Sequence, residues 1–161
     1  MHRAHLIFTA MDEKTALNMA RRLCSRREYS SFQIRERLIS EGIDDRQAGQ
    51  ILRTLKEEQF LDDARYLRSF IHDKWRFGRW GRMKIFHALR LQGFSAEDVQ
   101  SAWAEVDADA YAAMVQAELE KKFRALKQTP SYEVRQKLLR FGAGRGYDVA
   151  QMAGILDDIV R

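Results

Sequence analysis

The residues most able to do chemistry lie in a basic, aromatic stretch in the middle of the chain. Between Lys74 and Arg90 the sequence holds six lysines and arginines and no acidic residue. Trp75, Phe77 and Trp80 are interleaved with these cations. Guanidinium and ammonium groups attract phosphates and carboxylates, and aromatic rings stack on bases or fill pockets of a partner. The stretch therefore predicts a surface that binds a polyanion or an acidic protein groove.

Nine residues are our candidates for contact with a partner protein or DNA. Seven belong to this stretch, and two come from an earlier basic cluster that also contains Arg21 and Arg22. The candidates are Lys74, Arg76, Arg79, Trp80, Arg82, Lys84, Arg90, Arg26 and Arg27.

A second interpretation of the charges is intramolecular. The segment from Glu97 to Glu120 carries seven acidic residues and no lysine or arginine. The basic faces could pair with such acidic helices of the same molecule, or remain ordinary solvated surfaces. Trp80 also aligns with Tyr29 in the repeat described below, which favours a packing role for it. Both interpretations stay open beside the polyanion one.

No catalytic or metal-binding constellation accompanies these residues. His2 and His5 lie at the N-terminus, and His72 and His87 lie on different predicted helices without carboxylates at ligand spacing. Cys24 is the only cysteine, which excludes an intramolecular disulfide and a cysteine-based zinc site. Capping of helices explains two of the three carboxylate pairs, which are Asp44-Asp45, Asp62-Asp63 and Asp157-Asp158. We expect neither an enzyme nor a bound metal or cofactor.

Composition points to a helical, basic protein. The chain has 161 residues, one proline and a formal net charge of +5, and it is rich in residues that favour helices. A single cysteine fits a reducing compartment. No apolar run approaches the ~20 residues of a membrane span, and no cleavage site of a signal peptide is evident. We expect a monomer in the cytoplasm, without a membrane partner.

Apolar residues at helical spacing predict nine helices. The first runs from about Glu13 to Arg26, and the seventh ends near Leu126. Pro130 is predicted to take the first position of the eighth helix, because a proline there loses no useful N–H. Trp103 falls in the apolar pattern and is predicted to be core.

Three helix–helix junctions share one pattern. A glycine ends one helix by taking the left-handed conformation, and a serine or aspartate two residues later caps the next helix. A residue able to complete a capping box follows three positions after each cap. The junctions are Gly42-Ile43-Asp44, Gly93-Phe94-Ser95 and Gly146-Tyr147-Asp148. Three such junctions in one chain indicate a repeat.

The repeat has a period of about fifty residues. Shifts of 51 and then 53 residues superimpose apolar positions and the junction glycines, for example Ile34, Ile85 and Leu138. We therefore predict an all-α fold of three tandem three-helix repeats, residues 12–59, 60–106 and 107–161, after an N-terminal extension of residues 1–11. The extension is either a short packed segment or a disordered end.

The third repeat departs from the pattern at one position. Gly142 stands where Leu38 and Leu89 stand in the other repeats. Gly142 and Gly144 should lie inside the last turns of the eighth helix, where each costs ~1 kcal/mol relative to alanine. We expect the third repeat to be the loosest.

Three segments of the chain resemble the bacterial RecX family of regulatory proteins. They are RREYSSFQIRERLISEGI (Arg26–Ile43), FLDDARYLRSFI (Phe60–Ile71) and GRMKIFHALRLQGF (Gly81–Phe94). The resemblance covers residues 12–161 and is weakest in the third repeat. It implies that the three repeats form an elongated, curved array. It also implies a protein without enzymatic activity or cofactor.

The resemblance further implies a partner, the RecA recombinase filament. A protein of this family would lodge in the helical groove of the filament and modulate, most often inhibit, its ATPase, coprotease and strand-exchange activities. These activities serve recombinational repair and the SOS response. Some members also bind DNA, single- or double-stranded.

Two other functions stay open. A direct DNA-binding protein is one, because three-helix units resemble helix-turn-helix modules whose second helix enters the major groove. Here Glu97, Asp98 and Glu105 lie on such a helix, and their carboxylates would meet phosphates unfavourably. The other is a helical scaffold for an unrelated protein.

Overall fold

The structure, a computed structural model, describes residues 10–161, and every regular element in that range is a helix. The all-α prediction is therefore confirmed. The chain divides into two compact units at Tyr66 and Leu67, which we call the first and the second unit. Expectations for Leu6-Ile7-Phe8, His2 and His5 concern residues outside the described range. Among residues 10–161, no helix is both long and apolar enough to cross a bilayer.

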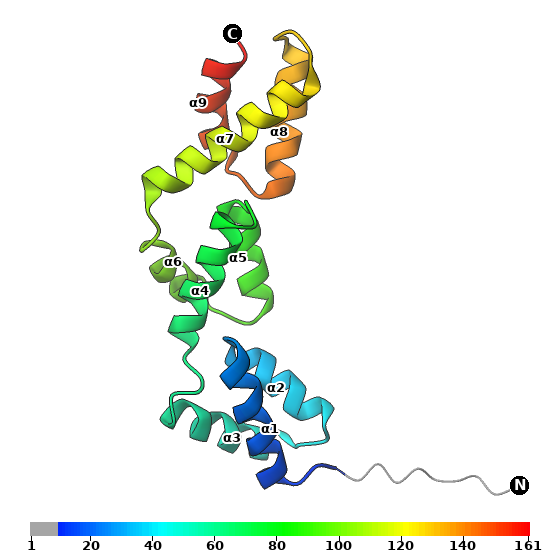
Figure 1. Ribbon diagram of the computed structural model, residues 1–161, viewed down its shortest axis with the longest axis vertical. Helices are drawn as coiled ribbons and strands as arrows, with labels where there is room; N and C mark the ends of the chain where they lie inside the picture. Colours follow the sequence, from blue (N-terminus) through cyan, green and yellow to red (C-terminus); the bar gives the residue numbers. More distant parts are fainter. Residues whose placement is uncertain (1–9) are drawn as a thin grey trace, which may run out of the picture. The chain divides into compact units, whose positions relative to one another are not determined.

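Nine helices make up residues 10–161, and the expected helix 13–26 is observed with those bounds (Figure 1). The helices are α1 (Glu13–Arg26), α2 (Ser31–Ser40), α3 (Asp45–Glu57), α4 (Asp63–Arg76), α5 (Arg82–Leu91), α6 (Ala96–Trp103), α7 (Ala108–Leu126), α8 (Tyr132–Arg145) and α9 (Val149–Ile159).

The first unit contains α1, α2 and α3, packed around one apolar core (Figure 1). Each helix contributes one stripe of side chains at helical spacing, and the opposite faces carry the charged residues. The core is completed by the segment that leads out of α3. Its fully buried members include Ala16, Ala20, Ile34, Leu38, Ala48, Ile51, Leu55 and Leu61.

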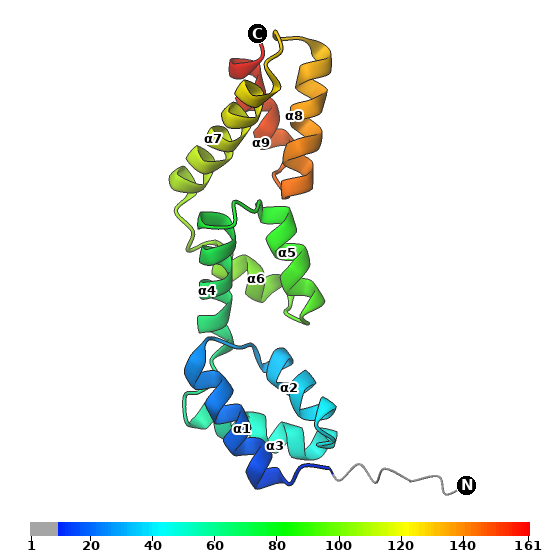
Figure 2. The same cartoon turned by 45° about the vertical axis from the view of Figure 1, so that its right-hand side comes forward.

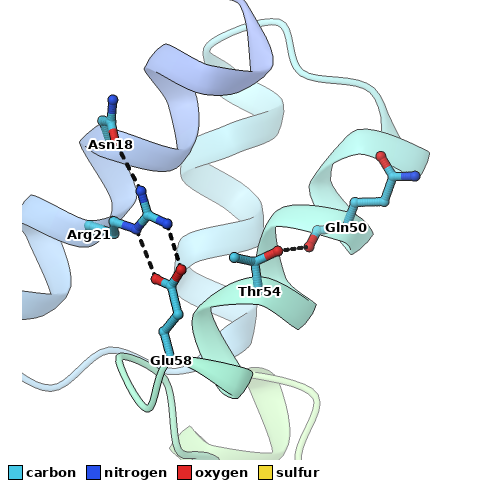
Figure 3. Close-up of polar contacts among 5 residues, drawn as sticks. All are labelled: Asn18, Arg21, Gln50, Thr54 and Glu58. Carbon is cyan, nitrogen blue, oxygen red and sulfur yellow. Dashed lines mark hydrogen bonds and ion pairs between the residues drawn. The ribbon is translucent and has the colours of Figure 1, made fainter.

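A bidentate ion pair ties α1 to the end of α3 (Figure 3). Arg21 Nε donates to Glu58 Oε2 at 2.9 Å, and Arg21 Nη2 donates to Glu58 Oε1 at 2.6 Å. A third bond joins Arg21 Nη1 to Asn18 Oδ1 at 3.1 Å. The guanidinium holds the pKa of the Glu58 carboxyl below its usual value. Arg21, part of the early basic cluster, is therefore engaged inside the molecule.

The Phe-Leu-Asp-Asp segment that resembles RecX proteins has a structural role at each acidic position. Leu61 is buried in the first core. Asp62 Oδ1 accepts a hydrogen bond from the N–H of Arg65 at 3.0 Å and so caps α4. Asp63 Oδ1 accepts from the N–H of Ser31, at the start of α2, at 2.8 Å. The carboxylate pair is explained by helix ends, as expected.

The second unit begins within α4, at Leu67, and contains two groups of helices, one from α4, α5 and α6 and one from α7, α8 and α9 (Figure 2). The three predicted junctions are confirmed. Their glycines have φ angles of 88°, 86° and 90°, and each cap accepts a hydrogen bond from the N–H three residues later. The glycines are Gly42, Gly93 and Gly146, and the caps are Asp44, Ser95 and Asp148.

Gly142 is a packing requirement in the third repeat. A β-carbon on Gly142 would overlap the sulfur of Met152 on α9. In the first repeat the equivalent pair is Leu38 with Ala48, both fully buried. The third repeat instead combines a very small residue on α8 with a large one on α9, so the pair still fills the core.

Two expectations were wrong. Pro130 does not begin α8, because Ser131 is the N-cap and its Oγ accepts from the N–H of Val134 at 3.2 Å. A serine cap stabilises a helix by ~1 kcal/mol relative to alanine, which outweighs the preference of proline for the first position. Trp103 is half-buried at the edge of the core, and its ring meets that of Tyr111 edge-on, with 5.0 Å between centroids.

Candidate partner-binding surface

Backbone contacts between the two helix groups of the second unit fix the segment from Arg79 to Met83. The N–H of Gly81 donates to the carbonyl of Arg145 at 2.7 Å, and the N–H of Met83 donates to the carbonyl of Gly146 at 2.9 Å. Gly81 is fully enclosed there, and a β-carbon on it would overlap the backbone of Gly146. The segment before α5 is thus held by the loop that follows α8.

Two buried tyrosines also hold this segment through their hydroxyl groups. The hydroxyl of Tyr111 accepts from the N–H of Arg82 at 2.8 Å, and the hydroxyl of Tyr147 donates to the carbonyl of Arg79 at 2.8 Å. Burial, with a smaller contribution from the nearby carboxylate of Glu118, raises the pKa of Tyr147 to about 12. Burial also raises the pKa of Tyr111. Both hydroxyls therefore stay protonated at neutral pH.

Trp80 lies in the middle of this fixed segment and gathers two of the candidate lysines. The ammonium groups of Lys74 and Lys84 lie 4.6 Å and 4.3 Å from the centroid of its ring. The ring of Phe70 meets it edge-on at 6.5 Å. We call Lys74, Trp80 and Lys84 the Trp80 cluster. Cations at this distance from an indole face are attracted to it by ~0.5–1 kcal/mol at exposed sites.

The Trp80 cluster is available to an external anion. Lys84 is exposed, and Lys74 and Trp80 are half-buried. Neither lysine lies within ion-pair distance of a carboxylate in the part of the chain that the structure describes. The three members come from α4, α5 and the fixed segment between them.

Arg79 pairs with a carboxylate of the same molecule, as the intramolecular interpretation of the charges predicts. Its Nε lies 3.8 Å from Glu118 Oε1 on α7, and Arg145 Nη1 lies 3.8 Å from the other oxygen of the same carboxylate. The side chain of Glu118 is only 15% exposed. Two guanidinium groups therefore share one carboxylate that is mostly shielded from water, and Arg79 belongs to the contact between the helix groups.

Arg82 and Arg90 are also engaged within the second unit. Arg82 Nη2 donates to Gln100 Oε1 on α6 at 2.9 Å, and its guanidinium lies 4.8 Å from the ring centroid of Phe86. Arg90 Nη1 donates to the carbonyl of Phe94 at 2.8 Å, next to the second glycine junction. These two arginines support the local structure around α5.

The three remaining candidates lie elsewhere. The guanidinium of Arg76 is 5.6 Å from the ring centroid of Trp75. Arg26 and Arg27 belong to the first unit, and Arg27 stacks over Tyr29 at 4.1 Å. Of the nine candidates, the structure brings together Lys74, Trp80 and Lys84.

Sequence reasoning did not identify the residues that position the cluster. Tyr147 occupies the middle of the third glycine junction, where the other repeats have Ile43 and Phe94. The hydroxyl of Tyr147, at a position where the other repeats have an apolar residue, was the feature of the sequence that could have indicated a positioning role. Glu118 carried no such signal, because it is one acidic residue among several on α7.

The sequence of this chain is similar to that of RecX proteins over most of its length. The pattern of the RecX second three-helix domain matches residues 62–102, and that of the RecX third three-helix domain matches residues 109–151. A regulatory protein RecX from Prosthecochloris aestuarii is 30% identical over 149 residues, which cover 92% of this chain and 96% of that protein. One from Clostridium perfringens is 29% identical over 133 residues, 81% of this chain and 62% of its own length. The chain therefore spans less than two thirds of the length of that relative.

Solved structures agree on the fold. A crystal structure of RecX from Lactobacillus salivarius superimposes with a TM-score of 0.81 at 14% identity, covering 91% of this chain and 95% of the other. A crystal structure of regulatory protein RecX gives a TM-score of 0.76 at 20% identity, covering 92% and 79%. At these identities the likeness concerns the three-helix architecture.

Proposed function

Since this chain belongs to the RecX family, we propose that it binds the RecA filament on DNA and lowers the filament's ATPase, coprotease and strand-exchange activities. In this proposal it acts in the cytoplasm, in recombinational repair and the SOS response, and needs no cofactor. Family membership carries the proposal, and the Trp80 cluster supplies a surface on which it can be tested.

The chemistry of the Trp80 cluster supports such a partner. A filament on DNA presents phosphates and carboxylates, and Lys74 and Lys84 offer two ammonium groups without ion pairs in the described residues. Trp80 adds an aromatic surface between them. The N–H of Trp80 donates to the carbonyl of Lys74 at 2.9 Å, and the N–H of Gly81 donates to the carbonyl of Arg145 at 2.7 Å, so little backbone order has to be gained on binding.

Direct binding to single-stranded DNA is the second candidate function. An aromatic ring flanked by cations is an arrangement on which bases stack while phosphates meet the charges. Insertion of α6 into a duplex groove is disfavoured, because Glu97 and Asp98 occupy its first turn. This candidate predicts DNA binding without RecA, with an affinity that falls steeply as salt rises.

A titration of RecA ATPase activity tests the proposal. Full-length chain is added to RecA of the same organism on single-stranded DNA, and hydrolysis is expected to fall at less than one copy per RecA. The variant Lys74→Glu/Lys84→Glu should need at least tenfold more protein, since each reversal replaces attraction by repulsion. The matched control is Lys14→Glu/Lys121→Glu, which changes the charge equally at two exposed lysines outside the cluster.

The outcomes separate the candidates. An unchanged hydrolysis rate together with no co-sedimentation of the wild type with filaments would overturn the proposal. Equal inhibition by the cluster variant and its control would remove the Trp80 cluster from the interface. A mobility shift of single-stranded DNA by the chain alone, lost in the cluster variant, would favour the DNA-binding candidate.

A further inference from the structure

The second unit contains a pocket that is separate from the Trp80 cluster, because none of the cluster residues lines it. It lies between α4 and the connection from α6 to α7, with a volume of about 340 Å³. Its apolar lining includes Ile71, Trp75, Ala102 and Val106, of which Trp75 is 5% exposed. A volume of this order lies at the lower end of the ~300–1,000 Å³ typical of ligand pockets. It suits one or two apolar side chains of a partner.

The rim of the pocket carries opposite charges on its two sides. Arg68 and Arg76 lie on α4, and Glu105 and Asp107 lie on the α6–α7 connection. Asp107 also caps α7 by accepting from the N–H of Ala110 at 3.1 Å. Within residues 10–161, no ion pair joins the two sides of the rim. Each side therefore keeps charge that can meet a partner.

An exposed aromatic side chain extends the apolar surface beyond the pocket. Phe77 is 73% exposed, and its ring meets His72 of the pocket lining edge-on, with 5.8 Å between centroids. Arginine and aromatic side chains around a small apolar pocket are the composition of binding hot spots between proteins. A large exposed phenylalanine at such a rim indicates a contact surface.

The charges select the kind of occupant. A nucleic acid strand would bring phosphates towards Glu105 and Asp107, which repel them. A polypeptide can present an apolar side chain between an acidic residue and a basic residue, and so match both sides of the rim. We propose that this pocket binds one apolar side chain of a protein partner, whose neighbouring carboxylate pairs with Arg68 and Arg76.

The inference rests on the proposed function in taking the RecA filament as the protein that supplies this side chain. The probe is RecA assembled on single-stranded DNA with a non-hydrolysable ATP analogue, and the measured quantity is the Kd of the labelled full-length chain. Ala102→Trp fills the pocket, and Arg68→Glu/Arg76→Glu reverses one side of its rim. Both variants should bind about tenfold or more weakly, the loss typical of hot-spot residues.

The control is Arg53→Glu/Arg140→Glu, which makes the same charge change at exposed arginines outside the pocket and should bind like the wild type. Far-UV circular dichroism checks folding, and if Ala102→Trp does not fold, the rim variant decides the test. If the wild type binds the filament and the rim variant binds with the same Kd, the pocket inference is overturned and the proposed function stays intact. Absence of wild-type binding overturns both.

Other occupants give different results in the same experiment. If the wild type forms a dimer and the rim variant does not, the occupant of the pocket is a second copy of the chain. Single-stranded DNA without RecA is a second probe. If the rim variant loses binding to it and the control does not, the occupant of the pocket is nucleic acid. Either result would overturn the inference of a peptide side chain from another protein.

Discussion

Gly81 and Gly146 meet backbone to backbone, and neither position has space for a side chain. A β-carbon on Gly81 would overlap the carbonyl group of Gly146, and one on Gly146 would overlap the backbone of Lys84. The approach allows the N–H of Gly81 to reach the carbonyl of Arg145 at 2.7 Å. The two helix groups of the second unit are thus joined through their main chains.

Gly81→Ala is therefore expected to destabilise the protein by about 1–3 kcal/mol, the usual cost of an added methyl group without space. Urea unfolding measures the loss. Gly144→Ala is the control, because a β-carbon there meets nothing within 4 Å and α8 is a helix. Alanine at that position should stabilise by about 0.5–1 kcal/mol.

Hydrogen exchange adds a local readout for the same pair of variants. The amide of Met83, which is bonded to the carbonyl of Gly146, should exchange faster in Gly81→Ala and at the wild-type rate in Gly144→Ala. A Gly81→Ala protein as stable as the wild type, with unchanged protection at Met83, would show that the close approach does not exist in solution.

Alkaline pH should loosen the second unit through Tyr147. Its folded pKa of about 12 lies above the ordinary value of 10.0. Above pH ~10 the unfolded chain loses a proton that the folded chain keeps, so the free energy of unfolding falls as pH rises towards 12. The slope from this one group is at most about 1.4 kcal/mol per pH unit, and there is no effect below pH ~10.

The variant Tyr147→Phe isolates this contribution. Its unfolding free energy should fall less steeply between pH 10 and 11.5 than that of the wild type. Tyr132→Phe is the control, because Tyr132 is 76% exposed and its removal should leave the wild-type slope unchanged. Identical slopes in all three proteins would contradict burial of the Tyr147 hydroxyl.

The residues Gly142 and Met152 should behave as one volume-matched pair. Gly142→Leu alone is expected to cost about 1–3 kcal/mol, because the new side chain meets the sulfur of Met152. Met152→Ala alone should cost about 2–5 kcal/mol by leaving a cavity. The double variant recreates the pairing of Leu38 with Ala48 and should cost at least about 1 kcal/mol less than the sum. Additive losses would contradict direct packing.

Cys24 should react slowly with thiol reagents in the folded protein. Burial, with a smaller contribution from the charge of Glu28, raises the pKa of its thiol from 9.0 to about 11. At pH 8 the thiolate fraction is then about 100-fold lower than in the unfolded chain. Alkylation by iodoacetamide, compared with and without urea, measures the ratio. A folded protein that reacts within a few-fold of the unfolded chain would contradict the prediction.

Helix ends and the repeat could be predicted from the sequence because they depend on neighbouring residues. The turn at Gly93 and the cap at Ser95 are decided by residues within four positions, through backbone sterics and single hydrogen bonds. The apolar spacing that places Ile34 and Ile85 in the core is equally local. Pro130 was misplaced because two local signals competed, and the Ser131 cap was stronger.

The sequence by itself therefore determined an all-α chain of three similar repeats, with a basic, aromatic stretch before α5. Tertiary structure alone decided which cations of that stretch remain available. Arg79 is drawn to Glu118, whereas Lys74 and Lys84 meet over Trp80. The physical reason is that the contact of Arg79 with Glu118 depends on how one helix group docks onto the other, through Gly81 and the loop after α8. No periodic pattern along the chain encodes such a contact between distant segments.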